Sequence, residues 1–236
     1  MQAISFLDKL HALGLLVFTV VDAEQVLDKS RQYVRLYLHR LEKRKLIFRI
    51  EKNKYALKGI NPLTIVTKLS KPSYISFLFA LYTHHLTTQI PIKIQVVSVV
   101  SKKPLAFENY DFEFIKFPAS RIFGYYKYRF GEGYAFLADK EKTVIDCLYL
   151  QKGVAVSDIN NALSSCDAKK LRGYAKRMDS TVLIQRLGYL LELNKIKNPV
   201  SFNKLISKNY VLLNPLLPKK GMKNSKWRII ANEVLE

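Results

Sequence analysis

Side chains that could bind the phosphates and base edges of DNA are concentrated between residues 29 and 58. This stretch holds eleven Lys and Arg residues against two acids, Glu42 and Glu51, a local balance of +9. Arginine and glutamine pair in bidentate fashion with guanine and adenine, and lysine binds phosphate oxygens. So dense a one-signed charge favours contact with nucleic acid over the alternative of an ordinary solvated basic face.

The first half of this stretch has the pattern of an amphipathic helix. Val34, Leu38 and Leu41 are spaced i, i+4 and i+7, which predicts one buried stripe with Tyr37 at its edge. Ser30 is the expected N-cap, with a hydroxyl that would accept from the free N–H groups of the first turn. The opposite face carries the residues that we expect to reach DNA. These are Arg31, Gln32, Tyr33 and Arg35 at base edges, and His39 and Lys43 nearer the phosphates.

A basic hairpin follows this helix. Leu46, Phe48 and Ile50 alternate with Ile47 and Arg49 as a first strand, and Tyr55 and Leu57 belong to a returning one. The tip, 51–54, includes an asparagine that suits a left-handed turn position. A helix followed by a hairpin is the order of a DNA-binding winged helix. We expect the hairpin to contact a minor groove or the flanking backbone through Arg49, Lys52, Asn53 and Lys54.

The elements around this motif complete a small N-terminal domain. The pattern predicts a helix over 4–13 that ends at Gly14, a short strand at 18–20, and a second helix over 22–27 with Asp22 as its N-cap. The Gly, Asn and Pro residues at 59–62 are typical of a linker. The sequence therefore predicts a winged helix-turn-helix DNA-binding domain at 1–62 and a second domain at 63–236.

The second domain has strand patterns first and helical patterns later. After a helix predicted over 74–85, we expect strands near 92–100, 110–114, 126–130 and 134–138. Helices follow at about 140–150, 156–164, 168–178 and 180–193. The fold class predicted for the chain is thus α+β: a winged helix-turn-helix followed by a mixed α/β domain with a small sheet and a helical C-terminal half.

Composition is that of a folded, strongly basic protein. The 236 residues carry a formal charge of +20 and are 49% apolar and 12% aromatic. Such an excess of positive charge attracts polyanions, and nucleic acid fits better than a membrane because every apolar run is too short for a spanning helix. Two cysteines, Cys147 and Cys166, without a Cys-x-x-Cys pair or an expected signal peptide, favour a cytoplasmic location.

Residue patterns for catalysis or metal binding are not evident. The histidines His11, His39, His84 and His85 have no partners at metal-ligand spacing. The glycines at 131 and 133 flank a turn and are not followed by the Lys-Ser/Thr of a phosphate loop. We therefore expect no enzymatic activity, no cofactor and no metal.

Two further features leave an alternative open. The segment 123–130 alternates aromatic and basic residues in a way that resembles a sheet on which single-stranded RNA bases stack. Residues 193–232 contain nine Lys/Arg and no Asp or Glu, with Trp227 as an expected anchor of the C-terminal segment. The alternative function is an RNA-associated or nucleic-acid-processing protein that uses an aromatic sheet and a basic C-terminal surface.

Several segments of the second domain carry a resemblance to a known family. They are Tyr74-Ile75-Ser76, Gln89-Ile90-Pro91, Phe123-Gly124, the stretch 138–148, and Leu171-Arg172-Gly173-Tyr174-Ala175-Lys176-Arg177 leading to 185–192. Together these segments resemble the AbiEi-like antitoxins of the AbiE abortive-infection systems, a family of transcriptional regulators of viral defence. The basic region at the C-terminus and Lys45 depart from the family pattern.

This resemblance implies a function and partners. It implies that the winged helix binds double-stranded DNA at inverted repeats in its own promoter and represses its operon. It also implies that the second domain antagonises a cognate nucleotidyltransferase-like toxin of a toxin–antitoxin system, functionally if not by stable contact. The expectation is thus a transcriptional repressor that is also an antitoxin.

Overall fold

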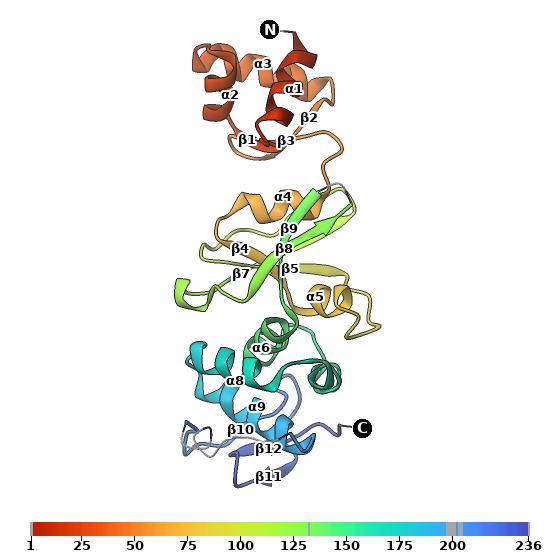
Figure 1. The fold of residues 1–236 in the computed structure, drawn as a ribbon, viewed down its shortest axis with the longest axis vertical. Coiled ribbons are helices and arrows are strands. Elements are labelled where there is room, and N and C mark those ends of the chain that lie inside the picture. Colours follow the sequence, from red (N-terminus) through yellow and green to blue (C-terminus); the bar gives the residue numbers. More distant parts are fainter. Residues whose placement is uncertain (1, 132, 197–201, 203–204, 236) are drawn as a thin grey trace.

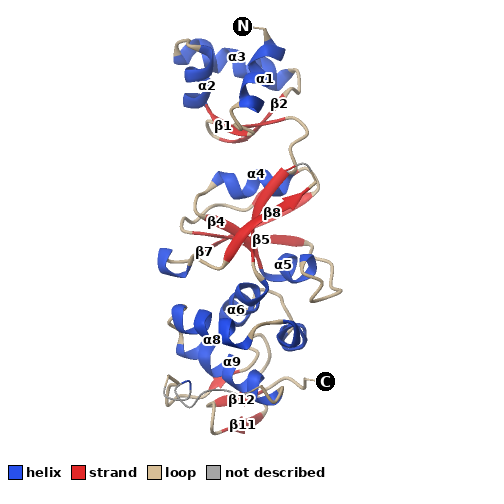
Figure 2. Cartoon of the chain, viewed as in Figure 1, coloured by secondary structure: helices blue, strands red, loops and turns tan. Residues whose placement is uncertain are grey.

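Helices and strands follow one another along an elongated molecule, with the N-terminus at one end and the last strands at the other (Figure 1). The computed structural model describes residues 2–131, 133–196, 202 and 205–235. A helical cap, a central sheet and a second helical group succeed each other in sequence order (Figure 2). The chain is therefore a mixed α+β protein, as its sequence predicts.

The N-terminal unit, residues 2–57, packs three helices on a three-stranded sheet. Its elements are α1 (Ala3–Ala12), β1 (Val17–Thr19), α2 (Val20–Leu27), α3 (Arg31–Lys43), β2 (Ile47–Glu51) and β3 (Lys54–Leu57). The strands lie in the order β1-β3-β2, and β3 is antiparallel to both neighbours. Val34, Leu38 and Leu41 of α3 are buried together with Phe6 and Leu10 of α1. The predicted stripe is confirmed.

Two helix caps differ from the prediction. Ser30 occupies the N-cap position of α3, but its side chain accepts no capping hydrogen bond. The N-cap of α2 is Thr19 and not Asp22. The Asp22 carboxylate instead accepts from the Thr19 backbone N–H at 2.6 Å, while the Thr19 hydroxyl accepts from the Asp22 N–H at 3.2 Å. Asp22 is thus the N3 residue of a capping box, and the N-cap of α2 lies three residues earlier than predicted.

A six-stranded mixed sheet forms the middle of the molecule. Its strands are β4 (Ser73–Ser76), β5 (Lys93–Ser98), β6 (Leu105–Phe107), β7 (Tyr110–Lys116), β8 (Tyr125–Phe130) and β9 (Gly133–Ala138), in the order β6-β7-β5-β4-β9-β8. The parallel pairs are β4 with β9 and β5 with β7; the other neighbours are antiparallel. The helix α4 (Pro62–Leu69) precedes the sheet, α5 (Phe77–Thr83) follows β4, and a 3-10 turn at Ala119–Arg121 precedes β8.

The helix predicted over 74–85 is wrong in its first half. Residues 73–76 form β4, a central strand, and the helix begins only at Phe77. All four residues of β4 are buried because helices or chain cover both sides of the sheet here. An apolar run that is buried on both faces has no alternation, so its pattern does not distinguish a strand from a helix.

The two faces of the sheet have different partners. On one face, Leu63 and Val66 of α4 pack on Ile75, Val96 and Leu137. On the other, a larger cluster joins the strands to the second helical group. In that cluster the sheet contributes Tyr74, Val97, Ile115 and Ala138, and the helices contribute Val144, Leu148, Leu171 and Leu187.

The C-terminal helices fall where the sequence predicts them. They are α6 (Lys140–Leu150), α7 (Val156–Ala162) with a 3-10 turn at Leu163–Ser165, α8 (Ala168–Arg177) and α9 (Thr181–Leu193). A small sheet follows, with the order β10-β12-β11, from β10 (Val211–Leu212), β11 (Met222–Asn224) and β12 (Ile229–Ala231). Trp227 is fully buried and its indole N–H donates to Glu192 at 2.7 Å. Its expected role as an anchor is confirmed.

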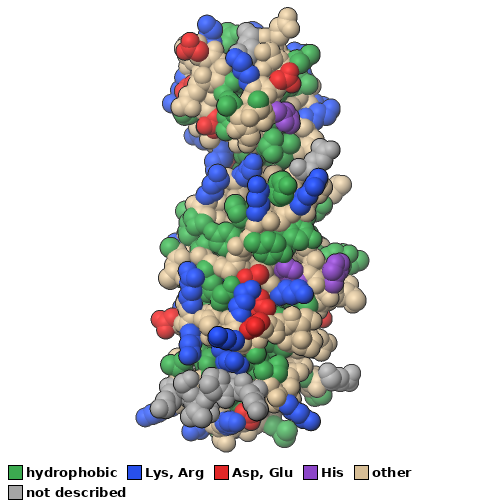
Figure 3. Space-filling view, viewed as in Figure 1, with side chains coloured by type: hydrophobic (Ala, Val, Ile, Leu, Met, Phe, Trp, Pro, Cys, Tyr) green, Lys and Arg blue, Asp and Glu red, His purple; other side chains and the backbone are tan. Residues whose placement is uncertain are grey.

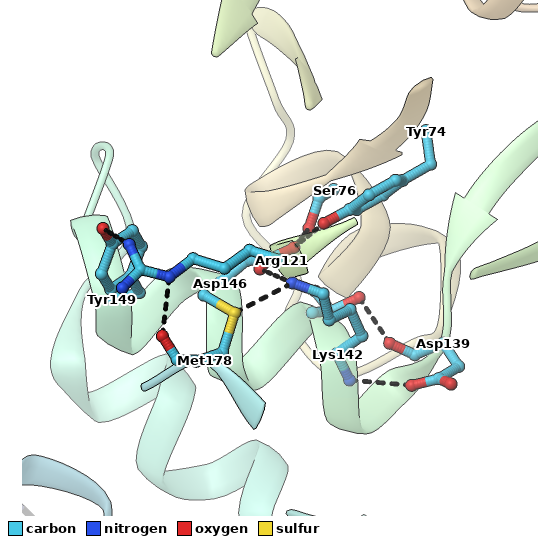
Figure 4. A network of polar contacts seen from close by, with 9 residues as sticks. Tyr74, Ser76, Arg121, Asp139, Lys142, Asp146, Tyr149 and Met178 are labelled. Carbon is cyan, nitrogen blue, oxygen red and sulfur yellow. Dashed lines mark hydrogen bonds and ion pairs between the residues drawn. The ribbon is translucent and has the colours of Figure 1, made fainter. Parts of the chain in front are cut away.

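A buried ion pair joins the sheet to the C-terminal helices (Figure 4). Lys142 and Asp146, one turn apart on α6, have no exposed side-chain surface, and the Lys142 ammonium donates to the Asp146 carboxylate. Tyr74 and Ser76 of β4 donate to the other carboxylate oxygen at 3.1 and 2.8 Å. The ammonium also faces aromatic rings, at 4.7 Å from the centre of Phe123. Burial lowers the pKa of Lys142 and raises the pKa of Asp146.

The hairpin β2–β3 is held between the N-terminal helices and the central sheet. Ile50 and Ala56 of the hairpin are buried against Ile65 and Leu69 of α4, and the Phe48 ring meets Phe107 edge-on at 5.8 Å. Ile47 and Leu57 point the other way, into the core of the N-terminal unit. A register shift between Arg49 and Glu51 separates the two buried positions of β2, Ile47 and Ile50, by three residues. The strict alternation predicted for this strand is therefore wrong.

We predict that Gly188→Ala strongly destabilises the protein. A Cβ atom on Gly188 of α9 would lie 2.1 Å from the ring of the buried Trp227, so the indole would have to move out of its packed position. Overpacking of this kind raises the free energy of the folded state by about 1–3 kcal/mol or more. Thermal or urea unfolding of the full chain measures the loss.

Gly173→Ala is the matched control. Gly173 lies in α8, and a Cβ there would meet no atom within 4 Å. Replacing a helical glycine by alanine at such an open position stabilises by roughly 0.4–1 kcal/mol. Equal stability of the two variants would show that Trp227 does not occupy the space above Gly188.

Candidate nucleic-acid interface

The outer face of α3 exposes most of the residues that the sequence predicts for DNA contact. Arg31, Gln32, Tyr33, Arg35, His39 and Lys43 are all exposed. Their backbone is fixed because Val34, Leu38 and Leu41, on the opposite side of the same helix, are buried in the N-terminal core. Six neighbouring polar or aromatic side chains thus project from one rigid helix.

Two of these side chains are already positioned by neighbours. The Arg31 guanidinium lies 3.6 Å from the carboxylate of Glu24, so this side chain is directed toward α2. The ring of Tyr33 stacks on Tyr37, with centroids 6.1 Å apart and an interplanar angle of 13°. Tyr33 remains 44% exposed, and Leu36 next to it 51%. The surface therefore offers ring and methyl groups as well as charges, and apolar contact is how a protein reads the thymine methyl.

Arg49 of the hairpin lies on the same face of the N-terminal sheet as Tyr55, because the two residues are opposed in the antiparallel register of β2 and β3. Burial raises the pKa of the Tyr55 hydroxyl. The positive charge of Arg49 acts to lower that pKa, the negative charge of Glu42 to raise it, and the positive charge of Arg35 on α3 to lower it. Both arginine side chains are exposed to solvent.

The hairpin tip is only partly available. Lys52 is exposed, and Asn53 has the predicted left-handed conformation with φ 62°. The carbonyl of Asn53 accepts from the backbone N–H of Val20, so its backbone is tied to the start of α2. Lys54 is half-buried and already paired: its ammonium donates to the carbonyl of Leu69 at 2.6 Å and lies 3.5 Å from Glu51. Glu51 is also paired with Lys102.

The structure thus separates the predicted residues into two groups: eight are exposed, while Asn53 and Lys54 at the hairpin tip are half-buried. Arg31, Gln32, Tyr33, Arg35, His39, Lys43, Arg49 and Lys52 share an exposed position on α3 or the hairpin. Lys54, in contrast, joins the hairpin to the residue that ends α4, a role that the sequence does not reveal because Leu69 is fifteen positions away. The physical reason is the apolar contact of the hairpin with α4, which brings the tip against the end of that helix.

Aromatic side chains of β8 and β9 lie on both faces of the sheet. Tyr126, Tyr128 and Phe130 point toward the α5 side, where His84 and Phe79 contact the row. Tyr125, Lys127 and Arg129 point to the opposite face, paired in register with Ala138, Phe136 and Tyr134. Sequence reasoning missed Tyr134 and Phe136, which are 44% and 37% exposed. In the structure they alternate with the buried Ala135 and Leu137, but residues 134–138 are apolar throughout, so the sequence carries no signal of the open face.

The histidine and cysteine side chains that could bind a metal or react are surrounded by other parts of the fold. His84 is partly buried, which lowers its pKa, and its ring nitrogen is 2.8 Å from the carbonyl oxygen of Ala138. Cys147 is buried and its thiol pKa is raised by burial. Within the described ranges, no three His, Cys, Asp or Glu residues gather as a metal site would require. Across the same residues, no helix is long and apolar enough to cross a membrane.

The basic C-terminal region is partly occupied with internal contacts. Lys226 pairs with Glu192 at 2.5 Å, and the Arg228 guanidinium lies over the Tyr210 ring. Lys197 and Lys204 fall outside the described residues. Part of the positive charge predicted for this region is thus used in contacts within the chain.

Comparison with known proteins finds a similar fold and gives no information on activity. No family model matches the chain, and no curated protein matches it either. Among solved structures, the crystal structure of the Rv2827c protein from Mycobacterium tuberculosis superposes with a TM-score of 0.59. The alignment has 11% sequence identity and covers 94% of this chain and 88% of that chain. At this identity the likeness is one of fold alone.

We predict that Lys52→Ala and Lys54→Ala affect duplex DNA binding differently. Lys52 is exposed at the hairpin tip, so its loss should weaken specific and non-specific binding alike and should reduce the slope of log K against log salt by about 0.9 for one lost phosphate contact. Lys54 is held by Leu69, so its loss should leave that slope unchanged and lower the stability instead. Anisotropy titrations at several salt concentrations measure the slopes. A smaller slope for Lys54→Ala would contradict this assignment.

Proposed function

We propose that this protein is a sequence-specific, DNA-binding transcriptional repressor of the winged helix class. The observation that carries the proposal is the outer face of α3. It presents Arg31, Gln32 and Arg35 on its first turns, followed by His39 and Lys43, from a helix whose other side is locked in a core. Side chains near the start of such a helix enter the major groove most deeply, where guanidinium and amide groups read bases.

Element order supports the same class. Three helices and a three-stranded antiparallel sheet occur in the order α1-β1-α2-α3-β2-β3, with β1 paired to β3. A second helix, a short turn and a third helix followed by a hairpin is the arrangement of winged helix-turn-helix domains. The domain division 1–62 and 63–236 belongs to this proposal. The start of α4 at Pro62, capped by the Asn61 side chain, supports it, while the buried contact of Ile50 with Ile65 crosses it.

An antitoxin role is the second part of the proposal. It rests on the resemblance of the segments at 74–76, 89–91, 123–124, 138–148, 171–177 and 185–192 to AbiEi-like antitoxins. In this proposal the protein acts in the cytoplasm, autoregulates its operon at inverted repeats in the promoter, and antagonises a nucleotidyltransferase-like toxin. The residues from 63 onward, which carry a net charge of +14, would supply the antagonism.

We predict that Arg35→Ala discriminates specific from non-specific binding. The Arg35 side chain is exposed on the second turn of α3, where a bidentate contact to guanine is worth about 1–3 kcal/mol of discrimination. Electrophoretic mobility shifts should therefore show a loss of about 5- to 150-fold on the duplex that contains the inverted repeat, and a much smaller loss on random duplex.

Lys169→Ala provides the control, because Lys169 is an exposed cation on α8 and its removal changes the net charge equally. It should leave the preference for the inverted repeat intact. Equal losses on both duplexes for Arg35→Ala would show that this side chain is only a phosphate contact. Failure of the intact protein to prefer the repeat would refute the repressor proposal.

Co-expression tests the antitoxin part. We expect the intact protein to restore growth of cells that express the nucleotidyltransferase-like toxin from the adjacent gene. We expect Arg35→Ala to restore growth as well when both genes are driven by an unrelated promoter, because antagonism is assigned to the residues beyond α3. Loss of rescue in that variant would place antagonism in the DNA-binding unit, and no rescue by either form would refute the antitoxin role.

A further inference from the structure

An open part of the central sheet combines exposed aromatic rings with exposed cations. On β9, Tyr134 and Phe136 are 44% and 37% exposed, and in the antiparallel register they face Arg129 and Lys127 of β8, both exposed. Opposed residues of an antiparallel pair share one face of the sheet. We call these four side chains the open-face patch. It lies more than seventy positions beyond α3 in sequence and is separate from the basic surface of that helix.

The rings of the patch are held by buried neighbours. Phe136 meets the ring of Tyr125 edge-on, with centroids 5.5 Å apart and an angle of 83°. Tyr125 stacks flat on the fully buried Tyr74 at 5.0 Å and 9°. Tyr74 in turn donates to Asp146 of the buried ion pair. The Phe136 ring therefore stands at the solvent end of an aromatic row whose other end is fixed, so it has little rotational freedom to lose when a flat ligand stacks on it.

The cations around these rings extend beyond the strands. The Lys127 ammonium lies 4.4 Å from the centre of the Tyr134 ring. Burial, and then repulsion from Lys71 and Lys127, lower the pKa of the Lys68 ammonium in the last turn of α4. In Figure 3, Lys and Arg side chains gather at the level of α4, and hydrophobic side chains form a band over the strands beside them. Asp111 and Glu113 of the same sheet face are on β7, separated from β9 by β5 and β4.

We infer that the open-face patch binds single-stranded polynucleotide. Tyr134 and Phe136 would stack on unpaired bases, while Lys127 and Arg129 would bind the phosphates between them. Rings with exposed faces bind any base, and a positive rim follows the backbone, which together form the usual basis of single-strand binding. An apolar peptide would leave these cations without a counter-charge, so charge complementarity favours a polyanion. The inference does not depend on the winged helix proposal.

The experiment compares three 20-residue strands with the full-length protein in fluorescence anisotropy titrations: oligo-dT, oligo-U, and an abasic sugar-phosphate strand. The abasic strand keeps the charges but lacks the bases. We expect the base-bearing strands to bind about tenfold or more tightly than the abasic one, since each stacked base contributes on the order of tenfold in affinity. A preference for oligo-U or for oligo-dT would identify RNA or DNA as the source of the strand, and either preference supports the inference.

Substitutions then locate the binding. Tyr134→Ala with Phe136→Ala should remove the advantage of the base-bearing strands and leave binding of the abasic strand unchanged. Lys127→Ala should reduce the slope of log K against log salt by about 0.7. Tyr82→Ala is the matched control, because Tyr82 on α5 is 43% exposed and lies outside the patch. Circular dichroism checks that each variant is folded, and Tyr134→Leu replaces the double variant if that one does not fold.

Three outcomes would overturn the inference. The first is equal affinity of the wild-type protein for the abasic and the base-bearing strands, which needs no variant and would leave only general charge attraction. The second is an unchanged base preference in the Tyr134 and Phe136 variants. The third is an equal loss in Tyr82→Ala. The separate Arg35→Ala variant keeps this result distinct from the winged helix proposal, because it should lose duplex specificity and retain single-strand binding.

Discussion

The pairing of Lys142 with Asp146 is the interaction on which the middle and the C-terminal part of the molecule depend. Two charges without solvent contact are stable only when every partner is in place, because the loss of hydration is large and an unpaired buried charge is strongly destabilising. Here the carboxylate receives the ammonium from α6 and two hydroxyls from β4, at 3.1 and 2.8 Å. Neither β4 nor α6 can shift by one residue without breaking this set. The pair therefore specifies how the sheet and the helices fit together, beyond what apolar packing requires.

The same dependence reaches the surface at both ends of the sheet. Through Tyr74 and Tyr125, the buried pair fixes the aromatic row that ends in Phe136. The pair also fixes β4, the strand that directly follows α4 in the chain. The helix α4 in turn packs against the hairpin of the N-terminal unit. The exposed surfaces of the chain are thus built on one continuous internal framework, although they are far apart in sequence.

Sequence alone predicts the helices of the C-terminal half and the buried stripe of α3. The stripe of Val34, Leu38 and Leu41 is clear because the opposite face of α3 meets solvent. The helices α6 and α9 are buried on most sides, and their length marks them as helices, since a buried strand is shorter. Residues 73–76 were not recognised as a strand because both faces are covered. The helix α4 and the short strands β6, β10, β11 and β12 were also missed, since they are set by tertiary pairing and carry little pattern of their own.

The candidate site shows the same division. The exposure of the outer face of α3, which includes Arg31 and Lys43, follows from helical periodicity and could be predicted from the sequence. The hydrogen bond from Lys54 to the Leu69 carbonyl depends on how separate elements pack, so no local pattern contains it. The open face at Tyr134 and Phe136 was missed for a similar reason, because only strand order shows which face is left uncovered.

The two-sided burial of the hairpin has a mechanical consequence. A short connection such as 58–61 commonly lets two units rotate relative to each other. Here, rotation of the N-terminal unit relative to α4 would expose Ile50 and Ala56 to water and break the hydrogen bond from Lys54 to Leu69. The N-terminal unit is therefore held in a fixed orientation, and the direction of α3 is determined by the packing of the hairpin on α4. If two copies of the chain bind one inverted repeat, the orientation of one α3 helix relative to the other along the DNA will be set by the rigid shape of the whole chain. It will not be set by the flexibility of a linker.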